Sequence, residues 1–388
     1  MATELLTTRR LRSLAALGLA GLVAASLAAC SSGAATQPSA TASAGQTADA
    51  LSAEVAALTK PLDAYPVPTD TADASVLKGK TVYYVPITMQ SPQFKITQKT
   101  VTDALTAVGA TVQACDGKAT PTDVSACITQ ATNTGAAAII TDAVPYVIAA
   151  NAIDAARAAG IPVLITNQVA SDKYPADGTL AYIPAGGGPM QAALAKWVTL
   201  DSARKANILI NQGTDGPAPA MFVAEGKKVY ASECPDCTVT INEVSSANFS
   251  LIPSSTSAAL LKDPNIAYVE SQFEQYLQPT QAGAEQAGRT DLKGLTGSVQ
   301  LGGLQALASG NFLYAAAGQA SAFQGWLDVD AAIRLVAKSE LPEYTIPVRL
   351  FTRESISGVT LTDAAELSGE WYGPTTFTDE FKKIWGVA

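Results

Sequence analysis

The sequence predicts an α/β fold with two lobes, each built around a parallel sheet, and three observations carry this prediction. Short apolar runs alternate with helix-periodic segments from residue 80 onward, a pattern typical of βαβ units. The alternation is interrupted at Gly186-Gly187-Gly188 and then starts again on the same plan. With 388 residues, 48% of them hydrophobic, the chain is also long enough to form two cores.

The first half of the alternation contains five apolar runs that we interpret as strands. TVYYVPI and AAAIIT are almost continuously apolar, as expected of strands that are covered on both faces. Between the strands, apolar residues recur at helical spacing, and Thr120-Pro121 supplies an N-cap and a first-turn proline for one helix. The expected strands are 81–87, 111–114, 136–141, 162–166 and 181–183, and the expected helices are 93–108, 122–132 and 146–159.

The second half repeats the plan after the glycine triplet. ANILIN and FLYAAA are its clearest strand runs. The triplet lacks the glycine spacing of a phosphate-binding loop, so we favour a hinge or a plain turn over a phosphate site. The expected strands are 206–211, 238–244, 266–269, 297–301, 312–317 and 346–351, and the expected helices are 190–203, 221–231, 251–262, 273–287 and 321–337.

Charge and composition exclude several classes of function. The formal net charge is −9, which gives no electrostatic support for a nucleic-acid partner. The chain has no His, which removes the commonest general base, every Ser-His or Cys-His nucleophile and the commonest zinc ligand. We therefore expect no metal, no cofactor and no enzymatic activity, and carboxylate, Lys or Tyr chemistry is the only catalytic route left open.

The N-terminus has the pattern of an export signal. Three arginines precede a short apolar run at 14–29, which is too short for a membrane span. The run ends in Leu-Ala-Ala-Cys30, which resembles the lipobox of bacterial lipoproteins. We expect 1–29 to be a signal peptide, Cys30 to be lipidated, and 30–76 to be a flexible, lipid-anchored linker, because its first part is small and polar. The alternative is a plain cleaved secretory signal.

The remaining four cysteines form two pairs that are close in sequence. An even number of cysteines in an exported chain favours disulfides, so we expect Cys115 to pair with Cys127 and Cys234 with Cys237. The Cys-Pro-Asp-Cys segment is also the spacing of a redox motif. Such motifs usually open a helix, whereas this one follows a predicted helix and precedes a strand, so we favour a structural disulfide.

The arrangement resembles the type I periplasmic-binding-protein fold, most closely its sugar-binding branch of ABC-transporter solute receptors, the ribose- and galactose-binding kind. The resemblance covers most of 77–357. It is carried by LKGKTVYYVPITMQSPQF, by TNTGAAAIITDAVPYVIAANAIDAARAAGIPVLITNQV, by ASGNFLYAAAGQASAFQGWLDVDAAIRLV and by IPVRLFTRESI.

The resemblance implies two Rossmann-like lobes joined by a three-strand hinge, with a ligand cleft between them. The implied crossings between lobes lie near 184–188, 318–319 and 351–354. The N-terminal lobe would then comprise 77–185 plus 319–350, and the C-terminal lobe 186–318 plus 351–388.

Candidate ligand-binding residues follow the strands, because ligands of open parallel sheets bind beyond the carboxyl ends of the strands. Two of them have a structural alternative: Phe94 as a core residue of the first helix, and Asp142 as a helix N-cap. The family places a polar residue for sugar hydroxyls at the position of Asp142 and a hinge glutamine at that of Gln319. The candidates are Ser91, Gln93, Phe94, Asp142, Tyr146, Asn167, Thr214, Asp215, Phe222, Gln272, Phe273 and Gln319.

Departures from the family pattern indicate the chemistry of the ligand. Asn167-Gln168 stands where relatives often have Asp-Arg, and Gly302-Gly303 stands where an Asp is usual. Because charged partners for vicinal hydroxyls are missing, we expect a neutral ligand that is less polyhydroxylated than a simple pentose or hexose: a modified sugar, a cyclic polyol or another cyclic compound.

The resemblance implies an exported receptor, lipid-anchored to the outer face of the bacterial cytoplasmic membrane. It would be monomeric and would deliver a small molecule to an ABC permease that works with a cytoplasmic ATPase. A ligand-sensing subunit of a membrane signalling protein is the alternative. A hydrolase using Asp142, Glu270 or Glu274 is a third reading, but nothing in the sequence fixes two carboxylates at the separation that glycoside hydrolysis needs.

Overall fold

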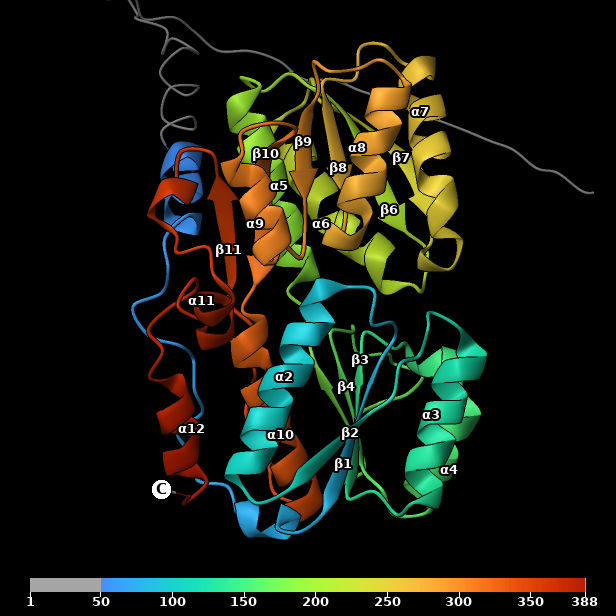
Figure 1. Cartoon of the computed structure of the whole chain (residues 1–388), viewed down its shortest axis with the longest axis vertical. Helices are drawn as coiled ribbons and strands as arrows, with labels where there is room; N and C mark the ends of the chain where they lie inside the picture. Colours follow the sequence, from blue (N-terminus) through green and yellow to red (C-terminus); the bar gives the residue numbers. More distant parts are fainter. Residues whose placement is uncertain (1–49, 388) are drawn as a thin grey trace, which may run out of the picture. The chain divides into compact units, whose positions relative to one another are not determined.

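Five parallel strands from the first half of the chain form the sheet of the first lobe in the computed structural model, which describes residues 50–387 (Figure 1). The order is β2-β1-β3-β4-β5, and β1 and β3 at its centre are buried along almost their whole length. The strands are β1 (Thr81–Pro86), β2 (Thr111–Ala114), β3 (Ala138–Asp142), β4 (Val163–Thr166) and β5 (Leu180–Ile183).

Six strands form the sheet of the second lobe, in the order β11-β10-β9-β8-β6-β7. All neighbours are parallel except β10 and β11, which pair antiparallel with Ala316 opposite Phe351. The strands are β6 (Asn207–Gly213), β7 (Thr238–Val244), β8 (Tyr268–Ser271), β9 (Lys293–Thr296), β10 (Leu313–Gln319) and β11 (Val348–Thr352). The predicted α/β class with two parallel-dominated sheets is therefore confirmed.

Helices cover both faces of each sheet, as continuous apolar strands require. In the first lobe these are α2 (Pro92–Ala107), α3 (Pro121–Asn133), α4 (Ala150–Ala158) and α10 (Ser321–Ala337). In the second lobe they are α5 (Gly187–Asp201), α6 (Ala218–Glu233), α7 (Ile252–Lys262), α8 (Leu277–Gln286) and α9 (Leu301–Ala308). Short 3₁₀ turns complete the chain: η1 (Ala74–Leu77), η2 (Tyr146–Ala149), η3 (Ser246–Leu251), η4 (Glu274–Tyr276) and η5 (Ile356–Gly358).

The sequence prediction was wrong at the ninth strand. It placed a strand at 297–301, whereas β9 is Lys293–Thr296 and α9 begins at Leu301. The run around Val299 is apolar because Val299 is buried in a turn, not because it belongs to a strand. The sequence did not predict α9 because two glycines, which have a low helix propensity, stand in its first turn.

The chain passes between the lobes where three crossings were predicted, with one shift. It leaves the first sheet at 184–186, returns at Ala320 between β10 and α10, and leaves again over 338–347 between α10 and β11. The third crossing thus precedes β11, whereas the prediction placed it after that strand. The cause is the antiparallel pairing of β11 with β10, which places 348–352 in the second lobe.

Residues 50–76 are packed against the lobes, which differs from the predicted flexible linker over 30–76. Residues 50–58 are helical, and Leu51 and Val55 are buried in one cluster with Trp197 of the second lobe. Farther along, the Tyr65 ring stacks on Phe323 of α10, with ring centroids 4.6 Å apart. The apolar residues Leu51, Val55 and Tyr65 are the sequence signal for this packing. The part of the predicted linker over 30–49 lies outside the described residues. The predicted signal peptide at 1–29 and lipidation site at Cys30 lie outside the described residues.

The C-terminal segment contacts both lobes, whereas the prediction assigned 351–388 to the C-terminal lobe: Glu366 accepts from the N–H of Leu301 in the second lobe, and 377–385 pack on α10 of the first. It contains α11 (Asp363–Ser368) and α12 (Phe377–Ile384), and it runs beside residues 62–72, with backbone hydrogen bonds between the two segments (Figure 1). Phe377, Phe381 and Trp385 recur at helical spacing and face α10. An aromatic stripe thus identifies the surface that the tail covers.

A buried polar group holds the end of this tail. Asp330 of α10 accepts hydrogen bonds from the indole Nε1 of Trp385 (2.7 Å) and the hydroxyl of Tyr344 (2.7 Å), and it forms an ion pair with Arg334 (2.8 Å). The Trp385 ring also stacks on Trp326, with centroids 5.5 Å apart and planes within 8°. Two interactions therefore hold the tail: the stacking of buried aromatic rings, and the hydrogen bond to the Asp330 carboxylate, which also binds residues of α10 and of the segment before β11.

The cysteines pair as their spacing predicted. Disulfides join Cys115 to Cys127 and Cys234 to Cys237. The second disulfide lies between the end of α6 and the start of β7, and its sulfurs therefore do not open a helix. Within residues 50–387, no helix combines the length and the apolar character that crossing a membrane requires.

Replacing Trp385 with alanine should lower the free energy of unfolding by about 3–5 kcal/mol, the usual cost of truncating a buried tryptophan. The variant loses the stack on Trp326 and the hydrogen bond to Asp330. Urea unfolding followed by circular dichroism measures the change. Lys383→Ala on the same helix is the control, because Lys383 is exposed and should cost little. Equal effects of the two variants would contradict the packing described here.

Candidate functional site

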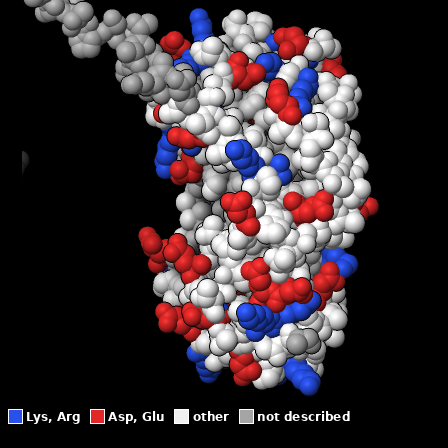
Figure 2. Space-filling view, turned by 90° about the vertical axis from the view of Figure 1, so that its left-hand side faces the viewer, with Lys and Arg blue, Asp and Glu red and all other residues white. Residues whose placement is uncertain are grey.

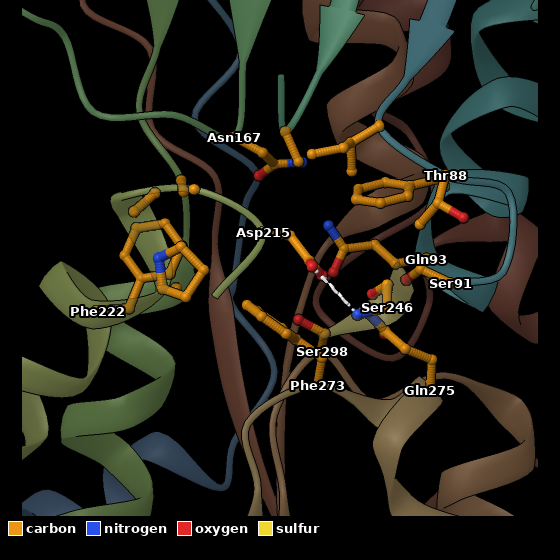
Figure 3. Close-up of a pocket in the computed structure, with 18 of the residues that line it drawn as sticks. Thr88, Ser91, Gln93, Asn167, Asp215, Phe222, Ser246, Phe273, Gln275 and Ser298 are labelled. Carbon is orange, nitrogen blue, oxygen red and sulfur yellow. Dashed lines mark hydrogen bonds between the residues drawn. The ribbon is translucent and has the colours of Figure 1, made fainter. Parts of the chain in front are cut away.

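A pocket lies where the carboxyl ends of the two sheets meet, as the fold class predicts (Figure 3). It contains about 650 Å³ of space, part of it open to solvent. Both lobes contribute to its lining. From the first lobe come Ile87, Thr88, Ser91, Gln93, Phe94, Ala143, Asn167 and Gln168; from the second lobe and the crossings come Ala185, Gly187, Met190, Asp215, Gly216, Ala218, Pro219, Phe222, Ser246, Phe273, Gln275, Tyr276, Ser298 and Gln319.

Three phenylalanines provide the apolar walls. Phe94 comes from the first turn of α2, Phe222 from α6 and Phe273 from the end of β8. Gly187, the first residue of α5, permits this arrangement, since a Cβ there would overlap the Phe222 ring. The glycine triplet therefore lies at a crossing between the lobes and also lets the Phe222 ring approach the backbone closely. Aromatic walls of this kind suit the apolar face of a ring-shaped ligand.

The lining has one charged side chain, Asp215, which is hydrogen-bonded by the protein. Its carboxylate accepts from the backbone N–H of Ser246 (3.0 Å) (Figure 3), from Ser245 Oγ (2.6 Å) and from the Tyr276 hydroxyl (3.0 Å). These bonds tie the loop after β6 to the loop after β7. Asp215 thus supports the wall of the pocket, and the remaining polar lining is neutral.

The neutral polar lining consists of amides and hydroxyls from several strand ends. Gln93 and Gln168 are 4% and 6% exposed, and both line the pocket. The Gln275 Oε1 atom is buried and has no hydrogen-bond partner among the described residues. Ser91 and Ser298, also buried, add hydroxyls from either lobe. Buried polar atoms need partners, so this lining favours a ligand that supplies neutral donors and acceptors.

Beneath the lining, the side chain of Gln319 links the two crossings nearest the pocket. Its Oε1 accepts from the backbone N–H of Gly186 (3.1 Å), and its Nε2 donates to Asn167 Oδ1 (2.9 Å) and to Gln324 Oε1 (2.7 Å). Asn167 has φ of 55°, a left-handed conformation that asparagine tolerates well. The predicted site residues Asn167 and Gln319 therefore both line the pocket and hold each other in place.

Two buried carboxyl groups lie under this network. Asp142 accepts from Tyr84 OH (2.6 Å) and Asn167 Nδ2 (2.7 Å), and Gln324 stands between it and Asp328. Burial raises the pKa of Asp142 to about 6, because loss of water outweighs the hydrogen bonds that favour its charged form. Burial, with Asp142 nearby, also raises the pKa of Asp328. The prediction that Asp142 contacts ligand is not supported by this arrangement; Asp142 positions Asn167 instead.

Three further predicted residues do not line the pocket. The Tyr146 hydroxyl donates to Asp154 on the outer side of the first lobe, and its ring stacks on Tyr174. Thr214 donates to the carbonyl of Val244. Gln272 points inward to the protein.

Gln272 is held by two backbone partners. Its Oε1 accepts from the N–H of Gly213 (2.8 Å) and its Nε2 donates to the carbonyl of Pro219 (2.7 Å). It therefore fixes the loop that carries Asp215, and it is not part of the pocket lining.

The structure brings together eight of the twelve predicted residues: Ser91, Gln93, Phe94, Asn167, Asp215, Phe222, Phe273 and Gln319. Among the polar residues that the prediction missed, Thr88, Gln168, Ser246, Gln275 and Ser298 all follow strands of the two sheets. Because they follow β1, β4, β7, β8 and β9, the rule that ligands bind beyond the carboxyl ends of strands could have identified them as candidates. Ser298 was missed because its strand was placed too late in the sequence.

Within the described part of the chain, no group of three or more Cys, Asp or Glu side chains is arranged to hold a metal ion. The buried carboxylates Asp142 and Glu270 belong to different lobes and are each engaged by protein amides. The lining offers binding contacts and shape, and its one carboxylate, Asp215, is hydrogen-bonded to Ser245, Ser246 and Tyr276.

Comparison with known proteins agrees with this geometry. Residues 82–340 match the family described as a periplasmic binding protein domain. No curated protein sequence matches the chain closely enough to count as a relative.

Solved structures resemble the chain in fold at low sequence identity. An ABC transporter solute binding protein from Mycobacterium smegmatis with bound glycerol is 18% identical, over 73% of this chain and 97% of its own, with a TM-score of 0.64. A 5-methylthioribose transporter solute binding protein from Thermotoga lettingae in complex with 5-methylthioribose is 18% identical, over 79% and 99%, with a TM-score of 0.65. A solute binding protein from Agrobacterium vitis with bound allitol is 19% identical, over 73% and 98%, with a TM-score of 0.64.

The buried carboxyls predict how stability depends on pH. Burial raises the pKa of Asp142 to about 6 and that of Glu270 to about 7, so the folded protein binds protons that the unfolded chain has released. Their stabilising contribution is therefore complete at low pH and is lost as pH rises through about 6–7. Since one pKa unit corresponds to about 1.4 kcal/mol, we expect these two groups together to lower the free energy of unfolding by about 4 kcal/mol between pH 5 and pH 8.

Urea unfolding at a series of pH values tests this expectation. Glu270→Gln keeps the shape of the side chain beside Gln191 and should remove part of the pH dependence. Glu285→Gln on the surface of α8 is the control and should leave the profile unchanged. Superimposable profiles for the wild type and Glu270→Gln would show that Glu270 does not titrate in this range.

Proposed function

We propose a function for this chain from the family to which it belongs, that of the periplasmic binding protein domain. The chain is an extracytoplasmic receptor that binds a small neutral solute between its lobes and delivers it to an ABC import permease. The observation that carries this proposal is the pocket at the carboxyl ends of both sheets, lined by Asn167 of one lobe, Phe222 of the other and Gln319 at a crossing. Since both lobes line the pocket, a bound solute would contact both.

The lining supports a neutral ligand with one apolar face. An anionic ligand would lose its hydration in the pocket, and neither Lys nor Arg is present in the lining to compensate. The carboxylate of Asp215 already accepts hydrogen bonds from Ser245 and Tyr276, while the amides of Gln93 and Gln168 are buried in the lining. The phenylalanine walls add the apolar contact that a cyclic compound or a modified sugar offers.

Known structures of similar fold are consistent with a ligand of this size. Those named above hold glycerol, 5-methylthioribose and allitol, which are small and uncharged. At 18–19% identity they resemble this chain in fold, so the ligand of this chain is inferred from its own lining.

The proposed location follows from the N-terminal sequence together with the family. The apolar run before Cys30 would direct export, and a diacylated Cys30 would anchor the protein to the outer face of the cytoplasmic membrane. Metabolic labelling with a fatty acid tests this, with Cys30→Ser as the variant that should lose both the label and membrane association.

Native mass spectrometry of the purified protein, followed by calorimetric titration, tests ligand binding. The titrated compounds are 5-methylthioribose, allitol, ribose, glucose and, as a charged counterpart, ribose 5-phosphate. We expect a neutral compound to bind best. Phe222→Ala and Asn167→Ala should weaken its binding by roughly tenfold or more, equivalent to about 1.4 kcal/mol, while Tyr146→Phe outside the pocket should not. Tightest binding of ribose 5-phosphate would contradict the proposal.

Uptake measurements separate transport from sensing. Deletion of the gene should abolish import of the compound identified above, and re-expression should restore it. Unchanged import together with a lost transcriptional or chemotactic response would instead identify a sensor subunit.

A further inference from the structure

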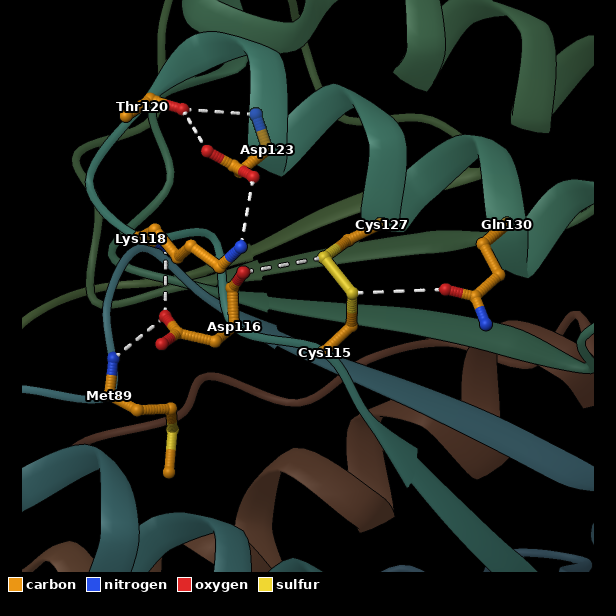
Figure 4. A network of polar contacts seen from close by, with 8 residues as sticks. All are labelled: Met89, Cys115, Asp116, Lys118, Thr120, Asp123, Cys127 and Gln130. Carbon is orange, nitrogen blue, oxygen red and sulfur yellow. Dashed lines mark hydrogen bonds and ion pairs between the residues drawn. A yellow bond between two sulfur atoms is a disulfide. The ribbon is translucent and has the colours of Figure 1, made fainter.

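The segment that follows β2 is bonded to the loop that follows β1, and that loop is part of the pocket wall. The backbone N–H of Gly117 donates to the carbonyl of Pro86 (3.0 Å), and that of Ala119 donates to the carbonyl of Ile87 (2.6 Å). Asp116 completes the contact, because its Oδ1 accepts from the N–H of Met89 (3.0 Å) (Figure 4). The two loops are thus joined by three hydrogen bonds.

The shape of this segment depends on the Cys115–Cys127 disulfide, which attaches its first residue to α3. Lys118 and Ala119 have φ of 47° and 58°, so two consecutive residues other than glycine adopt the left-handed conformation. Such a conformation persists only where the surroundings hold it. The disulfide at one end and the α3 N-cap at the other supply that restraint, with Thr120 Oγ1 accepting from the N–H of Asp123 (3.0 Å) (Figure 4).

Close packing leaves the two loops little freedom to separate locally. A Cβ at Gly117 would lie 2.6 Å from Val124 Cγ2, 2.8 Å from the Pro86 carbonyl and 2.9 Å from the Ile87 carbonyl. The same Asp116 Oδ1 that accepts from Met89 also accepts from the N–H of Lys118 (2.9 Å). Asp116 is therefore the one side chain that fixes both loops at once.

The loop that Asp116 holds leads directly into ligand-facing residues. Ile87 and Thr88 line the pocket, and Ser91, Gln93 and Phe94 follow within one turn of the next helix. The other disulfide, Cys234–Cys237, has no such connection. It precedes β7, whose first residue Thr238 pairs with Asn207 at the amino end of the second sheet, opposite the pocket end.

We propose that the Cys115–Cys127 disulfide and Asp116 act together as a positioning device for the β1–α2 wall of the pocket. The inference rests on the proposed function only in taking this pocket as the ligand site. The disulfide holds the 115–120 segment, the segment presents Asp116, and Asp116 holds Met89, so Thr88 and Gln93 stay at the pocket surface.

Amide hydrogen exchange read by mass spectrometry tests the inference without any ligand. In the full chain, Cys115→Ser combined with Cys127→Ser should speed exchange of the peptide covering 86–94 by tenfold or more. The matched control, Cys234→Ser combined with Cys237→Ser, should leave that peptide unchanged. Equal exchange of this peptide in both double variants, or no change in either, would overturn the inference.

Asp116 variants keep the disulfide and so separate positioning from general stability. Asp116→Ala removes the acceptor and should speed exchange at Met89, whereas Asp116→Asn keeps an oxygen there and should restore protection. Loss of protection in both variants to the same extent as global unfolding would overturn the role of Asp116.

Titration with 5-methylthioribose, or with the neutral compound of the panel that binds the wild type best, completes the test. The Cys115/Cys127 double variant and Asp116→Ala should bind it at least threefold more weakly, and the Cys234/Cys237 double variant should bind it as the wild type does. If the wild type binds none of the panel, the proposed function fails, whereas the exchange comparison still decides this inference.

Discussion

The hydrogen bonds of the Gln319 side chain are the constraint on which the arrangement of the site depends. One buried amide satisfies the backbone of Gly186 at the first crossing, the side chain of Asn167 at the end of β4 and that of Gln324 on α10. Without Gln319, the N–H of Gly186 and the Oδ1 atom of Asn167 would lose their hydrogen-bond partner, which is costly in a protein interior, whereas Gln324 Oε1 would keep its bond from Asn167 Nδ2. These hydrogen bonds therefore hold the site in one geometry. A substitution of Gln319, Asn167 or Gln324 would affect segments that are far apart in sequence.

Charged side chains are spread over the face of the molecule that Figure 2 shows, whereas the pocket lining has one, Asp215. Asp142 and Asp328 are buried behind the lining, and Asp215 is hydrogen-bonded to the protein. The lining thus consists of amides, hydroxyls, phenylalanine rings and one carboxylate. In the proposed function, such a lining would disfavour an anion, which would lose its water and meet no Lys or Arg.

The sequence predicted the two-sheet architecture well, because continuous apolar strands and helical periodicity are local signals. It also located Asn167 and Gln319, which lie at a strand end and a crossing. It placed Asp142 correctly at the end of β3, but the side chain bonds to Tyr84 and is not part of the pocket lining. Successive side chains of a strand point to opposite faces of the sheet, so the face that a strand-end residue occupies depends on a register that the sequence pattern left open.

The packing of the C-terminal segment has a practical consequence for studying this molecule. All four tryptophans lie outside the pocket lining, and two of them, Trp326 and Trp385, are stacked where the tail meets α10. Intrinsic fluorescence will consequently report detachment of the tail and remain largely silent about occupancy of the pocket. A reporter for solute capture has to be introduced, for example by placing an environment-sensitive dye at the rim near Val169 or Met221, both of which are exposed.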